Sequence, residues 1–133
     1  MTAALVLRLV SKVYGEGATA VHALHEVDLG VERGELVAIM GPSGSGKSTL
    51  LTIAGTLEDA TSGDVLIEGS EVRTMGASGR ARLRRRSIGF VFQDFNLLAG
   101  LTAAENVSMP LELDGMRARD ARAAASTALA NLG

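Results

Sequence analysis

The chain has 133 residues, which is long enough for one hydrophobic core, so we expect a single domain or part of one. Thirteen basic residues stand against fifteen acidic residues, and the net charge of −2 gives no support for a general nucleic-acid-binding surface. The absence of cysteine excludes disulfides and cysteine-ligated metals. Only His22 and His25 offer imidazoles, and this pair does not predict a metal site.

No segment of the sequence is suited to cross a membrane. The longest stretches without a charged residue are 36–46 and 123–133, each eleven residues long. A membrane-spanning helix needs about 20 predominantly apolar residues. The N-terminus lacks a basic start and Arg8 interrupts its apolar run, so we do not expect a signal peptide. The mean hydropathy of +0.23 fits buried parallel strands or a face that binds a partner.

The first forty residues contain three predicted strands. Leu5–Val10 alternates, with its leucines on one face and Arg8 on the other, which is typical of a half-exposed strand. His25–Val31 predicts a second strand, and a turn follows at residues 32–35. The continuous apolar run Leu36–Met40 predicts a strand that is buried on both faces.

The next segment combines helical and strand patterns. Apolar residues at helical spacing between positions 50 and 57 predict a helix after a glycine-rich loop. Asp64–Glu68 predicts a short strand that ends in a hairpin turn. Ser78–Arg86 predicts a short helix, and we interpret its five arginines as a solvated face rather than a membrane or phosphate patch. Ile88–Phe92 predicts another apolar strand.

The C-terminal part predicts two helices. Thr102 is suited to cap a helix that runs through Val107, and Glu105, three residues on, completes a capping box. Met116–Leu132 is rich in alanine and has an apolar face at helical spacing. Nothing later in the sequence covers that face, so we interpret the chain as part of a larger domain.

Residues 41–48 match the pattern G-x-x-x-x-G-K-[ST], which binds phosphate groups. Its glycines permit left-handed backbone angles and let main-chain N–H groups approach an anion. Lys47 provides an ammonium for the β- and γ-phosphates, and the hydroxyl of Ser48 is a ligand for Mg²⁺. The motif lies between a predicted buried strand and a predicted helix, as phosphate binding requires. The residues that we assign to this site are Gly41, Pro42, Ser43, Gly44, Ser45, Gly46, Lys47, Ser48 and Thr49.

The segment Gly41–Leu51 resembles the phosphate loop of the ATP-binding-cassette (ABC) family. Ile88–Gln93 resembles the strand and the Q-loop glutamine of that family. Leu24–Glu35 resembles the lead-in to the phosphate-loop strand, and Thr61–Gly63 resembles the turn before the next hairpin. Within the family, Phe95–Val107 is most similar to the lipoprotein-release and macrolide-export subfamily. The resemblance covers nearly the whole chain.

The resemblance implies roles for two residues outside the phosphate loop. Tyr14 stands where the family places an aromatic residue that stacks on adenine, with plain packing as the alternative. Gln93 stands where the family has a contact to Mg²⁺ or to the attacking water, with a polar strand cap as the alternative. ATP and Mg²⁺ are therefore the expected cofactors, with Ser48 and Gln93 at the metal. Asp94 is not assigned as the Mg²⁺-binding acid, because Gln93 separates it from the apolar run.

The expected fold is α/β: a P-loop NTPase core with an antiparallel β-subdomain and the start of a helical subdomain. As a partial ABC nucleotide-binding domain over residues 1–133, it should have its β-rich part at 1–35 and 61–75. The P-loop core is expected at 36–60 and the start of the helical subdomain at 94–133.

The resemblance implies a cytoplasmic ATPase subunit, peripheral on the inner face of the plasma membrane. Such a subunit dimerises with a second ABC ATPase subunit around ATP and drives a transmembrane permease, here of the exporter or lipoprotein-release type. The apolar segment 95–101 favours a permease-docking surface, the alternative being that it folds back onto a helical subdomain.

The sequence lacks the family's signature motif and its Walker B acid with the catalytic glutamate, so the 133-residue chain alone is expected to be inactive. Two other interpretations stay open. One is an ABC ATPase without a transport role, and the other is a catalytically incomplete nucleotide-binding fragment.

Overall fold

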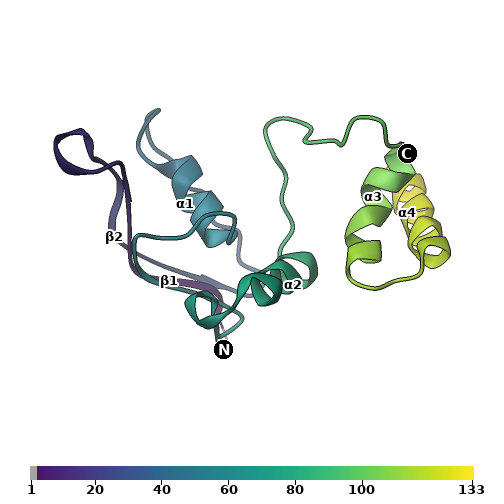
Figure 1. Cartoon of the computed structure of the whole chain (residues 1–133), viewed down its shortest axis with the longest axis horizontal. Helices are drawn as coiled ribbons and strands as arrows, with labels where there is room; N and C mark the ends of the chain where they lie inside the picture. Colours follow the sequence, from purple (N-terminus) through teal and green to yellow (C-terminus); the bar gives the residue numbers. More distant parts are fainter. Residues whose placement is uncertain (1–2) are drawn as a thin grey trace. The chain divides into compact units, whose positions relative to one another are not determined.

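A computed structural model describes residues 3–133, which form two units that divide between Ser87 and Ile88. The first unit is built on one antiparallel sheet with the strand order β2-β1-β3-β4 (Figure 1). Both strands that we predicted before residue 32 lie within longer strands of this sheet. The strands are β1 (Ala3–Tyr14), β2 (Val21–Glu32), β3 (Ser62–Ile67) and β4 (Ser70–Glu71), and a 3₁₀ turn η1 (Gly17–Thr19) lies between the first two.

The strand β1 contains a bulge that changes which of its residues are buried. The sequence predicted that the leucines at 5, 7 and 9 share one face, but Leu7 and Val10 are buried while Leu9 is 57% exposed. The register with β2 shifts between Leu7 and Val10, so one extra residue is inserted and the alternation is displaced. Gly63 on β3 lies against this bulge, and a Cβ there would be 2.4 Å from the carbonyl oxygen of Leu9. Its φ of +87° and this close approach both require glycine.

Two helices complete the first unit. Helix α1 (Lys47–Ala54) follows the glycine-rich loop, and its buried Leu50 and Ile53 form part of the core. Helix α2 (Ala77–Ser87) follows the 3₁₀ turn η2 (Val72–Thr74). Both helices were predicted, but Leu57 lies beyond the end of α1 and is exposed.

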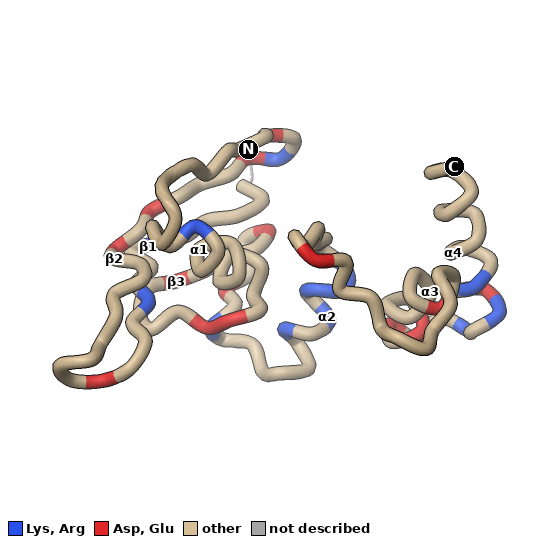
Figure 2. The backbone as a smooth tube through the Cα atoms, turned by 90° about the horizontal axis from the view of Figure 1, so that it is seen from above, with Lys and Arg blue, Asp and Glu red and all other residues tan. Residues whose placement is uncertain are grey.

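The arginines of α2 are more than a solvated face, although Figure 2 shows them as the densest basic run of the first unit. Arg80 forms an ion pair with Asp59 in the loop after α1. The guanidinium of Arg84 donates to the backbone oxygen of Thr56 in the same loop at 2.8 Å. Two of the five predicted surface arginines therefore attach α2 to the segment that follows α1.

Two predicted strands are not strands in the structure. Leu36–Met40 and Ile88–Phe92 have no strand assignment, and neither pairs with another segment among residues 3–133. Leu36 and Val91 are almost fully exposed. An apolar run predicts burial, but a strand also needs a neighbouring backbone that satisfies its N–H and C=O groups.

The second unit contains two helices that pack against each other, α3 (Ala103–Leu113) and α4 (Ala118–Leu132). The predicted capping box is confirmed: Thr102 Oγ1 accepts from the backbone N–H of Glu105 at 3.2 Å, and Glu105 accepts from that of Thr102 at 2.8 Å. Helix α3 continues beyond the predicted end at Val107 and includes Pro110. Among residues 3–133, no helix is long and apolar enough to span a bilayer.

Candidate functional site

The glycine-rich loop leads directly into α1 and is shaped by the backbone of Gly44 and Gly46. Both have left-handed φ angles, +80° and +93°. A Cβ at Gly46 would lie 2.4 Å from the carbonyl oxygen of Ala23 and 3.1 Å from the side chain of Leu24, both on β2. The loop therefore packs against β2 at a distance that only glycine permits. This close approach fixes the start of α1 relative to the sheet.

Lys47 folds its side chain back over the loop. Its ammonium donates to the carbonyl oxygens of Gly41 and Pro42, both at 2.7 Å, and to the hydroxyl of Ser45 at 3.3 Å. The backbone N–H of Ser45 donates to the oxygen of Pro42 at 3.2 Å, which closes a turn under the ammonium. Three donors of one cation thus meet three acceptors of its own loop, and the loop encloses a positive charge.

The start of α1 adds to the positive potential of this loop. The first N–H groups of a helix have no acceptor within the helix, and the helix dipole places partial positive charge there. The first turn of α1 contains no acidic residue, so no carboxylate offsets that charge. Ser48 is exposed and Thr49 is half-buried in this turn. The loop and the helix start together are suited to bind an anion such as a phosphate group.

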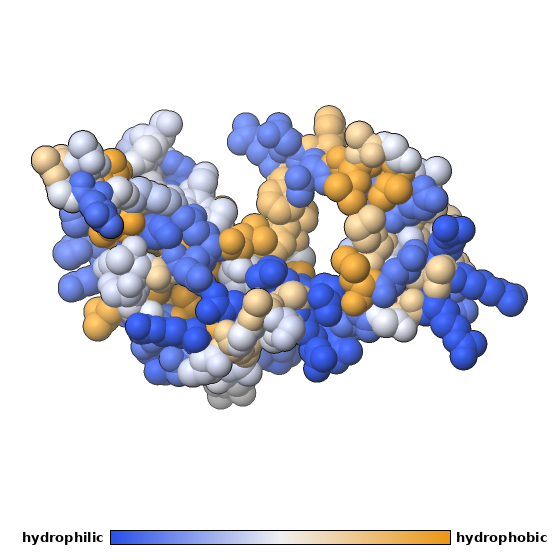
Figure 3. Space-filling view, in the orientation of Figure 1, coloured by the Kyte–Doolittle hydropathy of each residue, from blue (hydrophilic) through white to orange (hydrophobic). Residues whose placement is uncertain are grey.

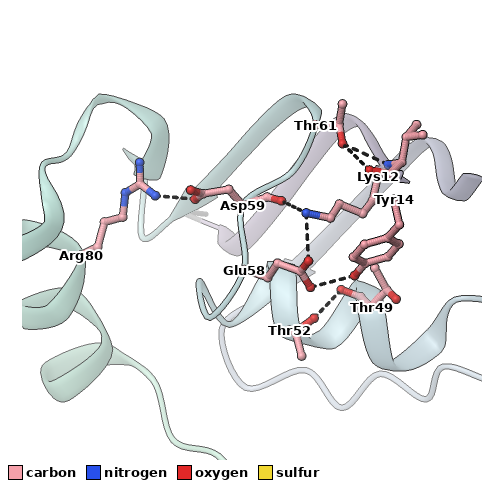
Figure 4. A network of polar contacts seen from close by, with 9 residues as sticks. Lys12, Tyr14, Thr49, Thr52, Glu58, Asp59, Thr61 and Arg80 are labelled. Carbon is pink, nitrogen blue, oxygen red and sulfur yellow. Dashed lines mark hydrogen bonds and ion pairs between the residues drawn. The ribbon is translucent and has the colours of Figure 1, made fainter. Parts of the chain in front are cut away.

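Tyr14 lies at the end of β1 and takes part in a polar network (Figure 4). Its hydroxyl donates to Glu58 Oε2 at 2.8 Å, while the ammonium of Lys12 lies 2.9 Å from Glu58 Oε1. Lys12 also donates to the backbone oxygen of Asp59 at 2.8 Å and lies 5.0 Å from the centroid of the Tyr14 ring. Tyr14 as a residue is 40% exposed. Its side chain is therefore held at the hydroxyl by Glu58 and on one face of the ring by Lys12, and it still reaches the surface.

The charge of Glu58 follows from this network. The hydrogen bond from Lys12 lowers the pKa of Glu58 most, and the hydrogen bond from Tyr14 lowers it next. A carboxyl group with a lowered pKa stabilises the fold above its ordinary pKa and loses that contribution as the pH falls through its lowered value. At neutral pH Glu58 is therefore a carboxylate that holds two residues of β1.

Gln93 and the apolar segment 95–101 belong to the second unit. Gln93 is exposed in coil, and Phe95, Leu97 and Leu98 are all more than half exposed. Figure 3 shows hydrophobic surface on this unit, and the exposed residues of this segment contribute to it.

The segment 98–102 is nevertheless ordered by one side chain on α3. Asn106 Oδ1 accepts from the backbone N–H of Leu98 at 2.8 Å. Asn106 Nδ2 donates to the backbone oxygen of Thr102 at 3.0 Å. These bonds fix the backbone beside the exposed leucine, so Leu98 is presented from an ordered turn rather than from a loose loop.

Three residues of these networks were not predicted from the sequence. Lys12 is two residues before Tyr14, so the period of a strand was a signal that both side chains share a face. Glu58 carried no such signal, because its partner Tyr14 is 44 positions away. Asn106 carried none because its partner Leu98, eight positions earlier, lies outside the helix that contains Asn106.

Comparisons with known proteins agree with this geometry. The family described as "ABC transporter" matches residues 24–133. The lipoprotein-releasing system ATP-binding protein LolD of Shewanella denitrificans is 45% identical over 132 residues, which is 99% of this chain and 57% of that protein. The macrolide export ATP-binding/permease protein MacB of Marinobacter nauticus is 46% identical over 127 residues, covering 96% of this chain and 20% of that protein.

A solved ATP-binding cassette, a dimer in a post-hydrolysis state bound to ADP and Pi, gives the same result. It superposes with a TM-score of 0.84 at 42% identity, over 92% of this chain and 54% of that one. The chain thus spans about half the length of this cassette and of LolD. The predicted fold, a P-loop core with an antiparallel β-subdomain and the start of a helical subdomain, is confirmed by this match. From the family match and these relatives, the chain belongs to the ABC transporter family.

Proposed function

We propose that this chain binds MgATP through residues 41–49 as part of the ATPase subunit that powers an ABC membrane transporter. The observation that carries the proposal is the ammonium of Lys47, which is held within a loop of left-handed glycines at the start of α1. LolD and MacB are ATP-binding proteins of lipoprotein release and macrolide export, which supports a transporter of that type.

The loop is suited to exchange its internal contacts for contacts with phosphate oxygens. The carbonyl oxygens of Gly41 and Pro42 now accept from Lys47, and phosphate oxygens are stronger acceptors for an ammonium because they are charged. The N–H groups from Gly44 to Thr49 would bind the remaining oxygens. ATP would supply the phosphoryl group that the reaction transfers, and this chain's residues would bind and orient it.

Three side chains would have specific roles in the proposed site. The exposed hydroxyl of Ser48 in the first turn of α1 would ligate Mg²⁺, and Gln93 would provide a second contact to the metal or to water. The half-exposed ring of Tyr14 would stack on the adenine base. These roles rest on the resemblance and on the exposure of each side chain.

A thermal unfolding experiment tests the nucleotide part of the proposal. A ligand that binds only the folded state, present at a concentration of about 100 times its Kd, stabilises that state by about 2.7 kcal/mol. We therefore expect MgATP to raise the melting temperature of the chain by several degrees, and MgADP to raise it as well. Adenosine, which lacks phosphate groups, should have little effect. A rise that sodium sulfate reproduces at equal ionic strength would contradict nucleotide binding.

The remaining partners follow from the family and are also proposals. The subunit would dimerise with a second ABC ATPase subunit, as in the solved cassette that is described as a dimer. It would associate with a transmembrane permease at the inner face of the membrane. The exposed, ordered segment 95–101 is the proposed docking surface, because an apolar loop on a protein surface usually has a partner.

Substitution of one exposed leucine tests the docking surface. In the subunit that assembles with its permease, Leu98→Glu should weaken co-purification of the two proteins while ATP affinity and melting temperature stay nearly unchanged. Leu98 is 52% exposed, so a charge there should cost the fold little. Leu113→Glu, which changes an exposed leucine on α3 outside the segment, is the matched control. A fall of several degrees in melting temperature for Leu98→Glu would show that Leu98 packs within the subunit instead.

A further inference from the structure

The polar network of Figure 4 joins the strand that carries Tyr14 to the segment that leaves α1. Each oxygen of the Glu58 carboxylate binds a different residue of β1. Oε2 accepts from the hydroxyl of Tyr14 at 2.8 Å, and Oε1 lies 2.9 Å from the ammonium of Lys12. Lys12 and Tyr14 are two residues apart on one strand, and this spacing places side chains on the same face. The carboxylate therefore fixes the ring through its hydroxyl and through the neighbouring cation.

Lys12 is held more tightly than a surface lysine. Its side chain is only 14% exposed, and its ammonium also donates to the backbone oxygen of Asp59 at 2.8 Å. At 5.0 Å from the ring centroid it lies within the range of a cation–π contact. In this contact the ammonium of Lys12 lies over one face of the Tyr14 ring and is attracted by its π electrons. Tyr14 as a residue stays 40% exposed, so it is still accessible to a planar ligand.

Glu58 is in turn fixed to the end of α1. The backbone N–H groups of Leu57 and Glu58 both donate to the carbonyl oxygen of Thr52, at 2.9 Å and 3.3 Å. The helix begins at Lys47 and has eight residues, which corresponds to a length of about 12 Å. The same short helix thus carries the phosphate loop at its start and the support of Tyr14 just beyond its end.

The sheet independently places the ring near the phosphate loop. Gly46 packs against Ala23 and Leu24 of β2, and Leu24 pairs with Lys12 of β1. Tyr14 is two residues further along β1, a distance of about 7 Å. A base joined to phosphates in the loop would therefore come close to the ring.

From these contacts we propose that Glu58 and Lys12 are positioning residues, which hold the Tyr14 ring as a base-stacking surface at a fixed distance from the phosphate loop. The proposal rests on the proposed function, since it concerns the base of a nucleotide whose phosphates the loop binds. Neither residue touches the nucleotide in this account. Both act through the ring.

The test compares two ligands that share their phosphates but differ in the base. The chain is titrated by calorimetry with ATP and with inorganic tripolyphosphate, each in the presence of Mg²⁺. Glu58→Ala should lower the affinity for ATP about five- to thirtyfold, within the range that loss of base–aromatic stacking spans. The affinity for tripolyphosphate should change less than about twofold, because its contacts do not involve the ring. Glu68→Gln, which alters another exposed carboxylate paired with an arginine, is the control and should change neither affinity.

Further variants separate positioning from a merely structural role. Tyr14→Phe keeps the ring but loses the bond to Glu58, and Glu58→Gln keeps an acceptor but loses the ion pair with Lys12, so each should lower ATP affinity less than Glu58→Ala. The double variant Tyr14→Ala with Glu58→Ala should bind ATP no more weakly than Tyr14→Ala alone, because Glu58 acts only through the ring. Additive losses, or equal losses for ATP and tripolyphosphate, would overturn the positioning role. If the unsubstituted chain does not bind tripolyphosphate at all, it is the proposed function that fails.

Discussion

Lys47→Ala should lower the affinity of the chain for ATP at least tenfold. The substitution removes the ammonium that the loop encloses, and hydrogen bonds to charged groups contribute about 1.5–3 kcal/mol each. A loss of 1.4 kcal/mol corresponds to a factor of ten in Kd. Because the contacts of Lys47 lie within its own exposed loop, the melting temperature should change little.

Equilibrium titration with a fluorescent ATP analogue measures this effect. Arg33→Ala is the control, since Arg33 is a surface cation paired with Glu68 and has no contact with the loop. The control should bind the analogue as the unsubstituted chain does. Unchanged binding by Lys47→Ala would mean that the nucleotide does not occupy the loop.

The second large effect concerns turnover. We expect the purified 133-residue chain to release phosphate from MgATP at no more than the background rate. Hydrolysis needs a group that positions or activates water, and charge stabilisation on the far side of the γ-phosphate. The sequence offers no catalytic glutamate after an apolar run and no signature motif. The resemblance to the ABC family implies that this charge stabilisation comes from a second subunit, so we expect this chain to provide half of a site.

A sensitive phosphate-release assay at saturating MgATP checks this expectation. Lys47→Ala, prepared in the same way, shows how much of any signal comes from contaminating ATPases. Steady release that disappears in Lys47→Ala would contradict the expectation and would place a catalytic carboxylate within these residues. Asp94, which follows Gln93, would then be the first candidate to examine.

The features that the sequence predicted well are those decided by neighbouring residues. The capping box of Thr102 and Glu105 joins residues three apart, and its two hydrogen bonds are present. The helix after the glycine-rich loop begins at Lys47, within the last two residues of the motif. In each case the residues that determine the structure lie within one helical turn, so their types and spacing are sufficient.

Features that depend on distant segments were predicted less well. The apolar runs Leu36–Met40 and Ile88–Phe92 were expected to be strands, yet neither has a pairing partner among residues 3–133. Hydrophobic composition does not tell whether a neighbouring backbone is available to pair. The bulge of β1 exposes Leu9 and buries Val10, and it lies against Gly63, a residue more than fifty positions later in the chain.

The candidate site shows the same division. The phosphate loop was recognisable from one contiguous motif, whereas the support of Tyr14 was not. Glu58 reaches Tyr14 across 44 positions of the chain, and its neighbours in sequence give no sign of that contact. Such a pair becomes visible only when β1 and the end of α1 are brought together by the fold.

Amide NMR shows directly whether residues 41–49 bind the phosphates of ATP. In a titration of the isotopically labelled chain with MgATP, the backbone amide resonances of Gly44, Gly46, Lys47 and Ser48 should shift most, because their N–H groups would donate to phosphate oxygens. The resonance of Tyr14 should also move, since its ring would meet the base. The resonances of the loop could instead stay in place while ATP binds and shifts resonances elsewhere, such as those of 95–101. This result would contradict ATP binding through residues 41–49.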